Sequence, residues 1–256
     1  MKLISIIVPC LNEQEVIPIF YRTVTEVLDS LENAEYELLF VDDGSDDRTL
    51  KVLKELKKKD RRCRYLSFTR NFGKEAAIYA GLTHAKGDYV GLMDVDLQDP
   101  PKFLGEMYRT LETGEYDCVA ARRTDRSGER RIRSFFSAMF YKVINKISKI
   151  EFVEGARDYR LMTRKMRDAV LKMGGNTTVF SKGLFSWVGF RTKWAFLPQR
   201  RTGGRGNEMV IRETAPVFAG RYPGIFHIAF VPVFLRWNFF SVGLRSWQSC
   251  FWLSGI

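Results

Sequence analysis

Short apolar runs alternate with amphipathic stretches along the first half of the chain. Largely apolar runs predict strands at residues 3–8, 36–41, 64–68 and 89–92, and the first of these runs is rich in β-branched residues. We expect intervening helices at residues 12–31, which have an apolar stripe, at 50–60, which are basic, and at 75–85, which have a face of small residues. Because strands and helices alternate in this way, we expect right-handed crossovers and an α/β fold with a mostly parallel central sheet flanked by helices.

The pattern is less regular in the second half. We expect a helix at 103–111, a strand at 116–121, a polar turn at 155–161, helices at 163–173 and 182–188, and an outer strand at 190–196. With 256 residues, 45% of them hydrophobic, the chain can bury a large core. One large domain is therefore the default expectation.

An acidic loop follows the fourth predicted strand. Asp94, Asp96 and Gln98 are spaced two apart, so three oxygen donors can converge from one turn at the carboxyl end of a strand. Open α/β sheets bind ligands at that edge, and Mg²⁺ or Mn²⁺ is held there by one or two carboxylates, water and substrate phosphates. Pro100 and Pro101 then suit the first turn of a helix. The alternative is a solvated acidic loop without a ligand.

Two further loops are candidates for a binding site. Asp42 and Asp43 follow the second predicted strand, where capping of the next helix explains Asp46 well but leaves these two aspartates unexplained. In the loop after the third strand, Gly73 permits close approach of the backbone to a ligand, and Lys74 suits a phosphate. A plain helix start fits this last loop equally well.

The chain is strongly basic. A formal net charge of +11 indicates an anionic partner, which is nucleic acid, a membrane surface or a phosphate-bearing substrate. No helix-turn-helix or zinc spacing accompanies the basic residues, so we do not expect nucleic acid. The four cysteines lack metal or disulfide spacing, which fits a reducing compartment. The first residues lack the pattern of a signal peptide, so we expect the N-terminal part in the cytoplasm.

A basic and aromatic segment follows the fifth predicted strand. Between residues 131 and 148, apolar positions recur at helical spacing, with Arg and Lys at the borders of the apolar face. A helix packed on a core can have this pattern. Aromatic residues with cationic flanks favour instead a helix that lies in a membrane interface, where apolar burial and attraction to anionic lipid act together.

Five motifs occur in order between Ile4 and about Arg201. They are Val8-Pro9 with Asn12-Glu13, Val41-Asp42-Asp43-Gly44-Ser45, Arg70-Asn71-Phe72-Gly73-Lys74, Asp94-Val95-Asp96-Leu97-Gln98 and Asp158-Tyr159-Arg160-Leu161. Together they resemble family 2 of the inverting glycosyltransferases, and within it the polyprenyl-phosphate branch of bactoprenol glucosyltransferases and dolichol-phosphate mannosyltransferase. The resemblance implies a GT-A fold that binds a nucleotide sugar over residues 1–201.

The resemblance also implies roles for single residues. Those expected to bind the nucleotide-sugar donor are Pro9, Asn12, Glu13, Asp42, Asp43, Asn71, Lys74 and Asp94, with Pro9, Glu13 and Asp42 at the base and ribose. Asp94, Asp96 and Gln98 would carry Mg²⁺ or Mn²⁺ on the diphosphate. The residues expected to act at the reaction centre are Asp96 and Asp158, and those expected at the acceptor's phosphate are Arg122 and Arg131.

The implied function is transfer of a hexose, glucose from UDP-glucose, to a polyprenyl phosphate at the cytoplasmic face of the membrane, with inversion and with a divalent metal ion. Sugar transfer needs a neutralised diphosphate leaving group, and a lipid phosphate is already anionic, which fits a site without histidine. Another sugar, a polysaccharide acceptor and an inactive nucleotide-sugar-binding remnant stay open as alternatives. A homo-oligomer also stays open.

Residues 202–256 depart from the family pattern. Members continue with the pattern R-x-x-G-E-T-K-W-S-F-x-K-L and then with membrane segments. At the corresponding place this chain reads Arg201-Thr202-Gly203-Gly204-Arg205-Gly206-Asn207-Glu208-Met209-Val210. Read one nucleotide later, the codons of Met209 and Val210 contain TGG, the codon of the expected Trp. We therefore hypothesise a frameshift near Gly203–Gly206, with a divergent tail as the alternative. Charges interrupt the apolar residues of 222–256, so we expect no clean membrane span there and peripheral or poor anchoring.

Overall fold

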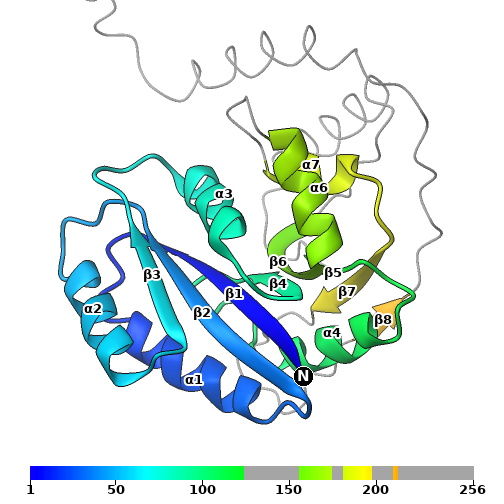
Figure 1. Cartoon of the computed structure of the whole chain (residues 1–256), viewed down its shortest axis with the longest axis horizontal. Helices are drawn as coiled ribbons and strands as arrows, with labels where there is room; N and C mark the ends of the chain where they lie inside the picture. The colour runs from blue at the N-terminus through cyan, green and yellow to red at the C-terminus, as the bar shows by residue number, and fades with distance from the viewer. Residues whose placement is uncertain (124–155, 175–180, 198–209, 213–256) are drawn as a thin grey trace, which may run out of the picture. The chain divides into compact units, whose positions relative to one another are not determined.

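The computed structural model describes residues 1–123, 156–174, 181–197 and 210–212 (Figure 1). Their elements follow in the order β1 (Lys2–Cys10), α1 (Ile17–Asp29), β2 (Ala34–Asp42), α2 (Thr49–Lys59), β3 (Cys63–Ser67), α3 (Lys74–His84), β4 (Tyr89–Leu92), α4 (Phe103–Glu112), β5 (Cys118–Arg123), β6 (Ala156–Thr163), α6 (Arg164–Gly174), α7 (Ser181–Trp187), β7 (Thr192–Leu197) and β8 (Val210–Arg212). All of them belong to one unit of the chain, Met1–Phe218.

One sheet joins the described strands in the order β3-β2-β1-β4-β6-β5-β7-β8. β1 pairs in parallel with β2 and β4, and β2 pairs in parallel with β3. β6 lies antiparallel between β4 and β5, β7 is parallel to β5, and the short β8 is antiparallel to β7. The expected mostly parallel sheet is confirmed, and among the described strands only β6 and β8 run against the others.

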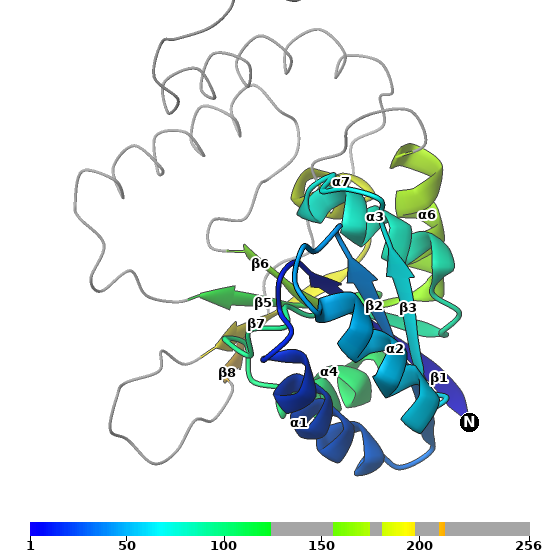
Figure 2. The same ribbon diagram turned by 90° about the vertical axis from the view of Figure 1, so that its left-hand side faces the viewer.

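Helices cover both faces of this sheet (Figure 2). α1 and α4 contribute Phe20 and Leu104 to one apolar layer, whereas α3 and α6 contribute Ile78 and Met166 to the other. β1 supplies residues to both layers because successive side chains of a strand point to opposite faces. The unbroken apolar run that predicted β1 therefore reflects burial on two sides.

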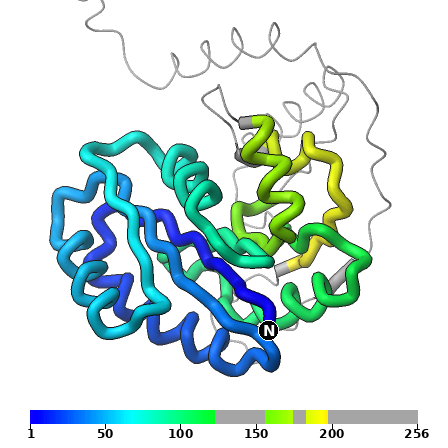
Figure 3. Tube along the Cα trace, viewed as in Figure 1, coloured from blue at the N-terminus to red at the C-terminus, as the bar shows by residue number. Residues whose placement is uncertain are grey.

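β1 lies between β2 and β4, with β3 beyond β2 (Figure 3). Since these four strands are parallel, their carboxyl ends lie at one edge of the sheet, as the alternation of strands and helices predicts. The loops that carry the first four sequence motifs leave the sheet at this edge.

The prediction of a polar turn at residues 155–161 was wrong. Most of this segment forms β6, in which Tyr159 and Leu161 are buried. Its backbone pairs with β4 on one side and with β5 on the other. The polar residues Arg157, Asp158 and Arg160 hid the strand, because a half-polar pattern gives no local sign that a segment is inserted between two other strands.

The prediction that the first helix begins near Asn12 was also wrong, since α1 begins at Ile17. Asn12 has a φ of 57°, a left-handed conformation that an α-helix cannot contain. Pro18 lies in the first turn of α1, where its missing N–H costs no hydrogen bond. The residues between β1 and α1 are consequently free to form part of the site.

The expected interfacial helix at 131–148, with Arg131, lies outside the described residues. So does the predicted tail at 202–256, except for Val210–Arg212 in β8. Among the residues that the structure describes, no helix has the length and apolar character needed to span a bilayer.

Candidate functional site

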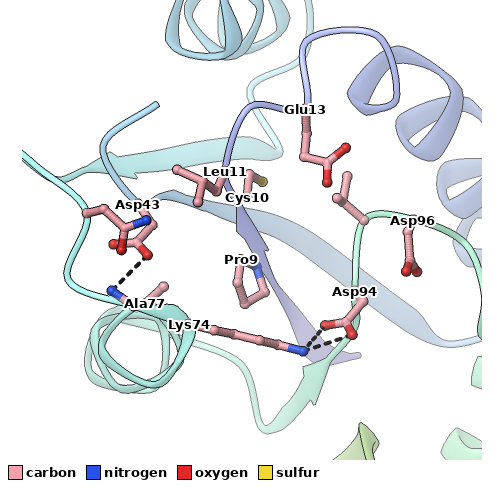
Figure 4. Close-up of a pocket in the computed structure, with 12 residues that line it drawn as sticks. Pro9, Cys10, Leu11, Glu13, Asp43, Lys74, Ala77, Asp94 and Asp96 are labelled. Carbon is pink, nitrogen blue, oxygen red and sulfur yellow. Dashed lines mark hydrogen bonds and ion pairs between the residues drawn. The ribbon is translucent and has the colours of Figure 1, made fainter. Parts of the chain in front are cut away.

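A pocket of about 290 Å³ opens at the carboxyl edge of β1 to β4 (Figure 4). It is lined by Pro9, Cys10, Leu11, Glu13, Asp43, Asn71, Gly73, Lys74, Ala77, Asp94, Val95 and Asp96. These residues come from the end of β1, from the loops after β1 to β4 and from the start of α3. The place is the one at which open α/β sheets bind their ligands.

Hydrogen bonds hold the loops after β1 and β2 together. The Asn12 backbone N–H donates to Ser45 Oγ at 2.9 Å, and the Asn12 side-chain oxygen accepts from the Asp46 backbone N–H at 2.9 Å. The Glu13 backbone N–H donates to Thr49 Oγ1 at 2.8 Å. Asn12 therefore lies behind the pocket and positions Glu13, which lines it.

Asp42 and Asp43 differ in their surroundings although they are adjacent. Asp42 is buried and accepts hydrogen bonds from the hydroxyls of Ser45 and Ser67 at 2.5 and 2.9 Å, so its carboxylate fixes loops. Asp43 lines the pocket and accepts from the backbone N–H groups of Phe72 and Gly73 at 2.8 and 2.9 Å. Helix capping explains neither residue, in agreement with the sequence pattern.

Two glycines allow these loops to approach each other. Gly44 has a φ of 72°, and a Cβ atom there would clash with the backbone of Arg70. Gly73 has a φ of 97° and immediately precedes α3. Both positions need a conformation that residues with a Cβ rarely adopt. They bring the loop after β3 against the loop after β2 and set Lys74 at the pocket.

Lys74 connects Asp94 with Asp158. Its Nζ lies 2.7 and 2.8 Å from the two oxygens of Asp94 and 2.8 Å from Asp158 Oδ2. Burial alone would lower the pKa of Lys74, but the hydrogen bonds to Asp158 and Asp94 raise it above its ordinary value. Two carboxylates that lie far apart in the chain are therefore joined by one ammonium.

Asp96 and Glu13 lie on the opposite side of the pocket from Lys74 (Figure 4). Asp96 is exposed, and its Oδ1 accepts a hydrogen bond from the Gln98 backbone N–H at 3.0 Å. Partial burial raises the pKa of Glu13, and repulsion from the carboxylates of Asp96 and Asp47 adds to the effect. The carboxylates of Glu13, Asp96 and Asp47 are thus close enough to repel one another at this side of the pocket.

The charges that line the pocket fit a divalent cation. Glu13, Asp43, Asp94 and Asp96 face a single ammonium, that of Lys74. A phosphate-bearing ligand is itself anionic, so a further cation would favour its binding beside these carboxylates. Among the described residues, no group of three or more His, Cys, Asp or Glu side chains is arranged to enclose a metal ion. Magnesium sites of one or two carboxylates completed by phosphate and water match this arrangement.

The structure brings most of the residues predicted for the site to one place. Those that line the pocket are Pro9, Glu13, Asp43, Asn71, Lys74, Asp94 and Asp96. Asn12 and Asp42 lie behind it, and Asp158 reaches it through Lys74. Gln98 is not among the lining residues, and its side-chain oxygen accepts a hydrogen bond from Arg157 at 3.4 Å. Arg122 is in β5, with its guanidinium 5.8 Å from the ring of Phe196.

Two arginines of β6 have structural roles that the sequence did not predict, although Arg160 belongs to the fifth motif. Arg157 forms an ion pair with the buried Asp99 at 3.1 Å and so anchors the loop after Asp96. Arg160 is buried, donates to the backbone carbonyls of Arg157 and Asp158, and stacks over Phe185 at 4.0 Å. Both were hidden by the missed strand. The only local signal was the basic pair that flanks Asp158 and Tyr159.

The mixed α/β sheet and its acidic edge define a GT-A type of fold, and a solved structure shares it. The mannosyltransferase PcManGT from Pyrobaculum calidifontis, in complex with GDP-Man and Mn2+, superposes with a TM-score of 0.50 at 20% sequence identity. The match covers 74% of this chain and 53% of that one. The family model described as Glycosyl transferase family 2 matches residues 5–171, so the chain belongs to this family.

Curated relatives agree with this family. The chain is 43% identical over 189 residues to a prophage bactoprenol glucosyl transferase homolog of Escherichia coli strain K12, which covers 74% of the chain and 61% of the relative. The chain is also 43% identical to the bactoprenol glucosyl transferase of Shigella phage SfV, and this match covers 74% of the chain and 61% of that relative. The chain thus spans about three fifths of the length of these relatives.

Proposed function

We propose that the protein transfers a hexose, glucose from UDP-glucose, to a polyprenyl phosphate at the cytoplasmic face of the membrane, with inversion and with a divalent metal ion. The observation that carries the proposal is the acidic pocket at the carboxyl edge of β1 to β4, in a chain that is 43% identical to relatives named bactoprenol glucosyl transferases.

The donor occupies this pocket in the proposal. Pro9 in β1 and Glu13 in the loop after it line the pocket, and together with Asp42 they would hold the base and ribose. Asp94 and Asp96 would hold Mg²⁺ or Mn²⁺ on the diphosphate, where the ion stabilises the charge of the leaving group as a Lewis acid. Gln98 would have to leave Arg157 before it could join them.

The transfer is a single displacement. An oxygen of the lipid phosphate forms the new bond to C1 of the sugar, and the bond from C1 to the diphosphate oxygen breaks, with its electron pair leaving on UDP. The nucleophile is already anionic, so the protein mainly has to position it. Asp158, joined to Lys74, would face this centre, and Arg122 with Arg131 would bind the acceptor's phosphate.

The test is transfer by the full chain. Radiolabelled UDP-glucose is incubated with undecaprenyl phosphate in detergent, with Mn²⁺ and with EDTA, and the product is extracted into organic solvent. Label in the organic phase that depends on Mn²⁺ supports the proposal. If label enters the organic phase only with another radiolabelled nucleotide sugar, the donor sugar is not glucose but the class of reaction is the one proposed. Donor binding without any product favours a nucleotide-sugar-binding remnant.

A matched variant separates the site from the rest of the chain. Asp96→Asn removes a pocket carboxylate whose side chain is exposed and whose contact with the Gln98 backbone an amide oxygen can keep. We expect it to fold like the wild type and to lose Mn²⁺-dependent transfer. Asp46→Asn, in the neighbouring loop and outside the pocket lining, is the control that should retain transfer.

A further inference from the structure

Lys74 makes a contact that a plain phosphate-binding lysine does not need. It is the first residue of α3, and its ammonium reaches both oxygens of Asp94 and one oxygen of Asp158. Asp94 follows β4, and Asp158 lies near the start of the antiparallel β6. One cation therefore joins the carboxylate proposed to bind the metal to the carboxylate proposed to face the acceptor.

The position of the ammonium conflicts with a metal ion on Asp94. Nζ lies 2.7 and 2.8 Å from the two Asp94 oxygens, so it occupies the face that a bound ion would use. A divalent ion sits about 2.0–2.6 Å from its carboxylate oxygens. Two cations that share one carboxylate repel each other across a few ångströms. The ion can bind Asp94 fully only when Lys74 moves away from it.

We propose that Lys74 competes with the divalent cation for Asp94, and that the nucleotide diphosphate ends this competition by accepting the ammonium of Lys74. The inference rests on the proposed function, because it uses the assignment of Asp94 to the metal. Its consequence is coupling: the cation alone binds weakly, and the diphosphate strengthens its binding. Linkage makes the effect reciprocal, so the cation also strengthens binding of the diphosphate.

The contact with Asp158 extends this coupling toward the acceptor side. While Lys74 bridges the two carboxylates, it compensates the charge of Asp158 and holds β6 close to the loop after β4. When the ammonium turns to the diphosphate, contacts with phosphate oxygens replace its contacts with Asp94, and the bridge between the two carboxylates opens. Donor binding therefore changes the charge that surrounds Asp158. Asp158 then becomes ready for the acceptor only after the donor has bound.

The test measures Mn²⁺ binding to the full chain by electron paramagnetic resonance of the free ion, with and without UDP. Lys74→Gln removes the competing charge, and Lys74→Arg keeps it. We expect Lys74→Gln to bind Mn²⁺ alone at least about fivefold more tightly than the wild type, within the usual range of coupling between sites. We also expect UDP to strengthen Mn²⁺ binding less in this variant, while Lys74→Arg stays close to the wild type.

The outcomes separate this inference from the proposed function. Equal or weaker Mn²⁺ binding by a folded Lys74→Gln variant, beside a wild type that binds Mn²⁺ with UDP, overturns the competition alone. A wild type that binds no Mn²⁺ under either condition overturns both. Lys51→Gln, an exposed position on α2 away from the pocket lining, controls for loss of a positive charge as such. Thermal unfolding of each variant checks that it folds.

Discussion

Glu37 is a buried carboxylate at the opposite end of β2 from the pocket. It accepts hydrogen bonds from Ser5 Oγ at 2.6 Å, from the Lys86 backbone N–H at 2.9 Å and from Arg64 at 2.7 Å. Burial alone would raise the pKa of Glu37, but these hydrogen bonds hold it below its ordinary value. The group ties β1 and β2 to β3 and to the turn before β4.

The first prediction concerns the pH dependence of stability that follows from Glu37. A lowered pKa in the folded state stabilises the protein above the unfolded pKa of about 4.3, and this contribution is lost as pH falls through the folded pKa. We expect Glu37→Gln to cost about 1–3 kcal/mol at pH 7. Urea unfolding of both proteins between pH 7 and about pH 3 should show the difference shrink below the unfolded pKa. A difference that does not vary with pH would contradict this account.

Asp43 gives the second prediction at the scale of a single residue. Its carboxylate accepts two backbone N–H groups of the loop that carries Lys74, so it sets that loop at the pocket. An Asn side chain accepts with one oxygen and presents an NH₂ group to the other donor. We therefore expect Asp43→Asn to weaken UDP binding in the presence of Mn²⁺ by about tenfold, the loss of one charged hydrogen bond.

Calorimetric titration with UDP measures this effect. Asp46→Asn changes an exposed carboxylate of the same loop and should leave UDP affinity as it is. If both variants bind UDP like the wild type, Asp43 does not position the pocket loop.

The element that most affects the site is β6. It enters the sheet antiparallel between β4 and β5, with Leu92 opposite Arg160, and this brings Asp158 to Lys74. Arg160 fixes the strand from the other side, because it donates to the carbonyls of Arg157 and Asp158 and stacks over Phe185 of α7. Burial lowers the pKa of the Arg160 guanidinium from its ordinary value. Burying the charged guanidinium of Arg160 is costly. A role in positioning Asp158 would explain why the protein has a buried arginine here.

The third prediction is that Arg160 acts on turnover and leaves donor binding unchanged. Arg160→Lys keeps the positive charge but loses the planar stack and one of the two carbonyl contacts. We expect kcat for the proposed transfer to fall about tenfold to a hundredfold, since small misplacement of a reacting group has effects of this size. The affinity for UDP with Mn²⁺ should stay within about twofold of the wild type, because Arg160 lines no part of the pocket.

Steady-state kinetics and UDP titration on the same preparations measure both quantities. Phe185→Leu, which removes only the ring under Arg160, should show a smaller fall of the same kind. A parallel loss of UDP affinity and kcat would mean that Arg160 merely supports the fold.

The same strand marks the limit of what the sequence predicts. The strands β1, β2 and β4 follow from apolar runs that contribute to both core layers, and α1, α2 and α4 follow from their apolar stripes. The acidic loops follow from their position after those strands. The place of β6 depends on partners elsewhere in the chain, so its polar residues suggested a turn. The pairing of Lys74 with Asp158 spans 84 residues and leaves no local trace.

At the scale of the whole molecule, charge is distributed unevenly. The chain carries a net charge of +11, yet the pocket is lined by four carboxylates and one lysine. The excess positive charge that indicated an anionic partner therefore lies elsewhere than in the pocket lining. This separation agrees with two anionic ligands in the proposed reaction, a donor that binds with its own cation and a lipid phosphate that meets arginines.

The fourth prediction concerns the genetic origin of residues after Gly203–Gly206. If the reading frame shifts there by one nucleotide, the family pattern Glu-Thr-Lys-Trp must be encoded across the codons of Gly206, Asn207, Glu208 and Met209. Glu requires the codon GGA at Gly206, and Thr requires AAC at Asn207. We expect both codons in the gene. Another codon at either position would leave a divergent tail as the explanation.

The hypothesised frameshift would have a physical consequence that fractionation can measure. In the given frame, Arg236 and Arg245 interrupt the apolar residues near the end, and a charge at the centre of a span costs about 2.5–3.5 kcal/mol. We expect this chain to be released from membranes by high salt or alkaline carbonate, because attraction between basic residues and anionic lipid is screened. The chain translated in the shifted frame should resist both treatments, and both chains should bind UDP with Mn²⁺ alike. Firm retention of the given chain in carbonate would contradict the expectation, since only an apolar segment that enters the bilayer withstands loss of the electrostatic attraction.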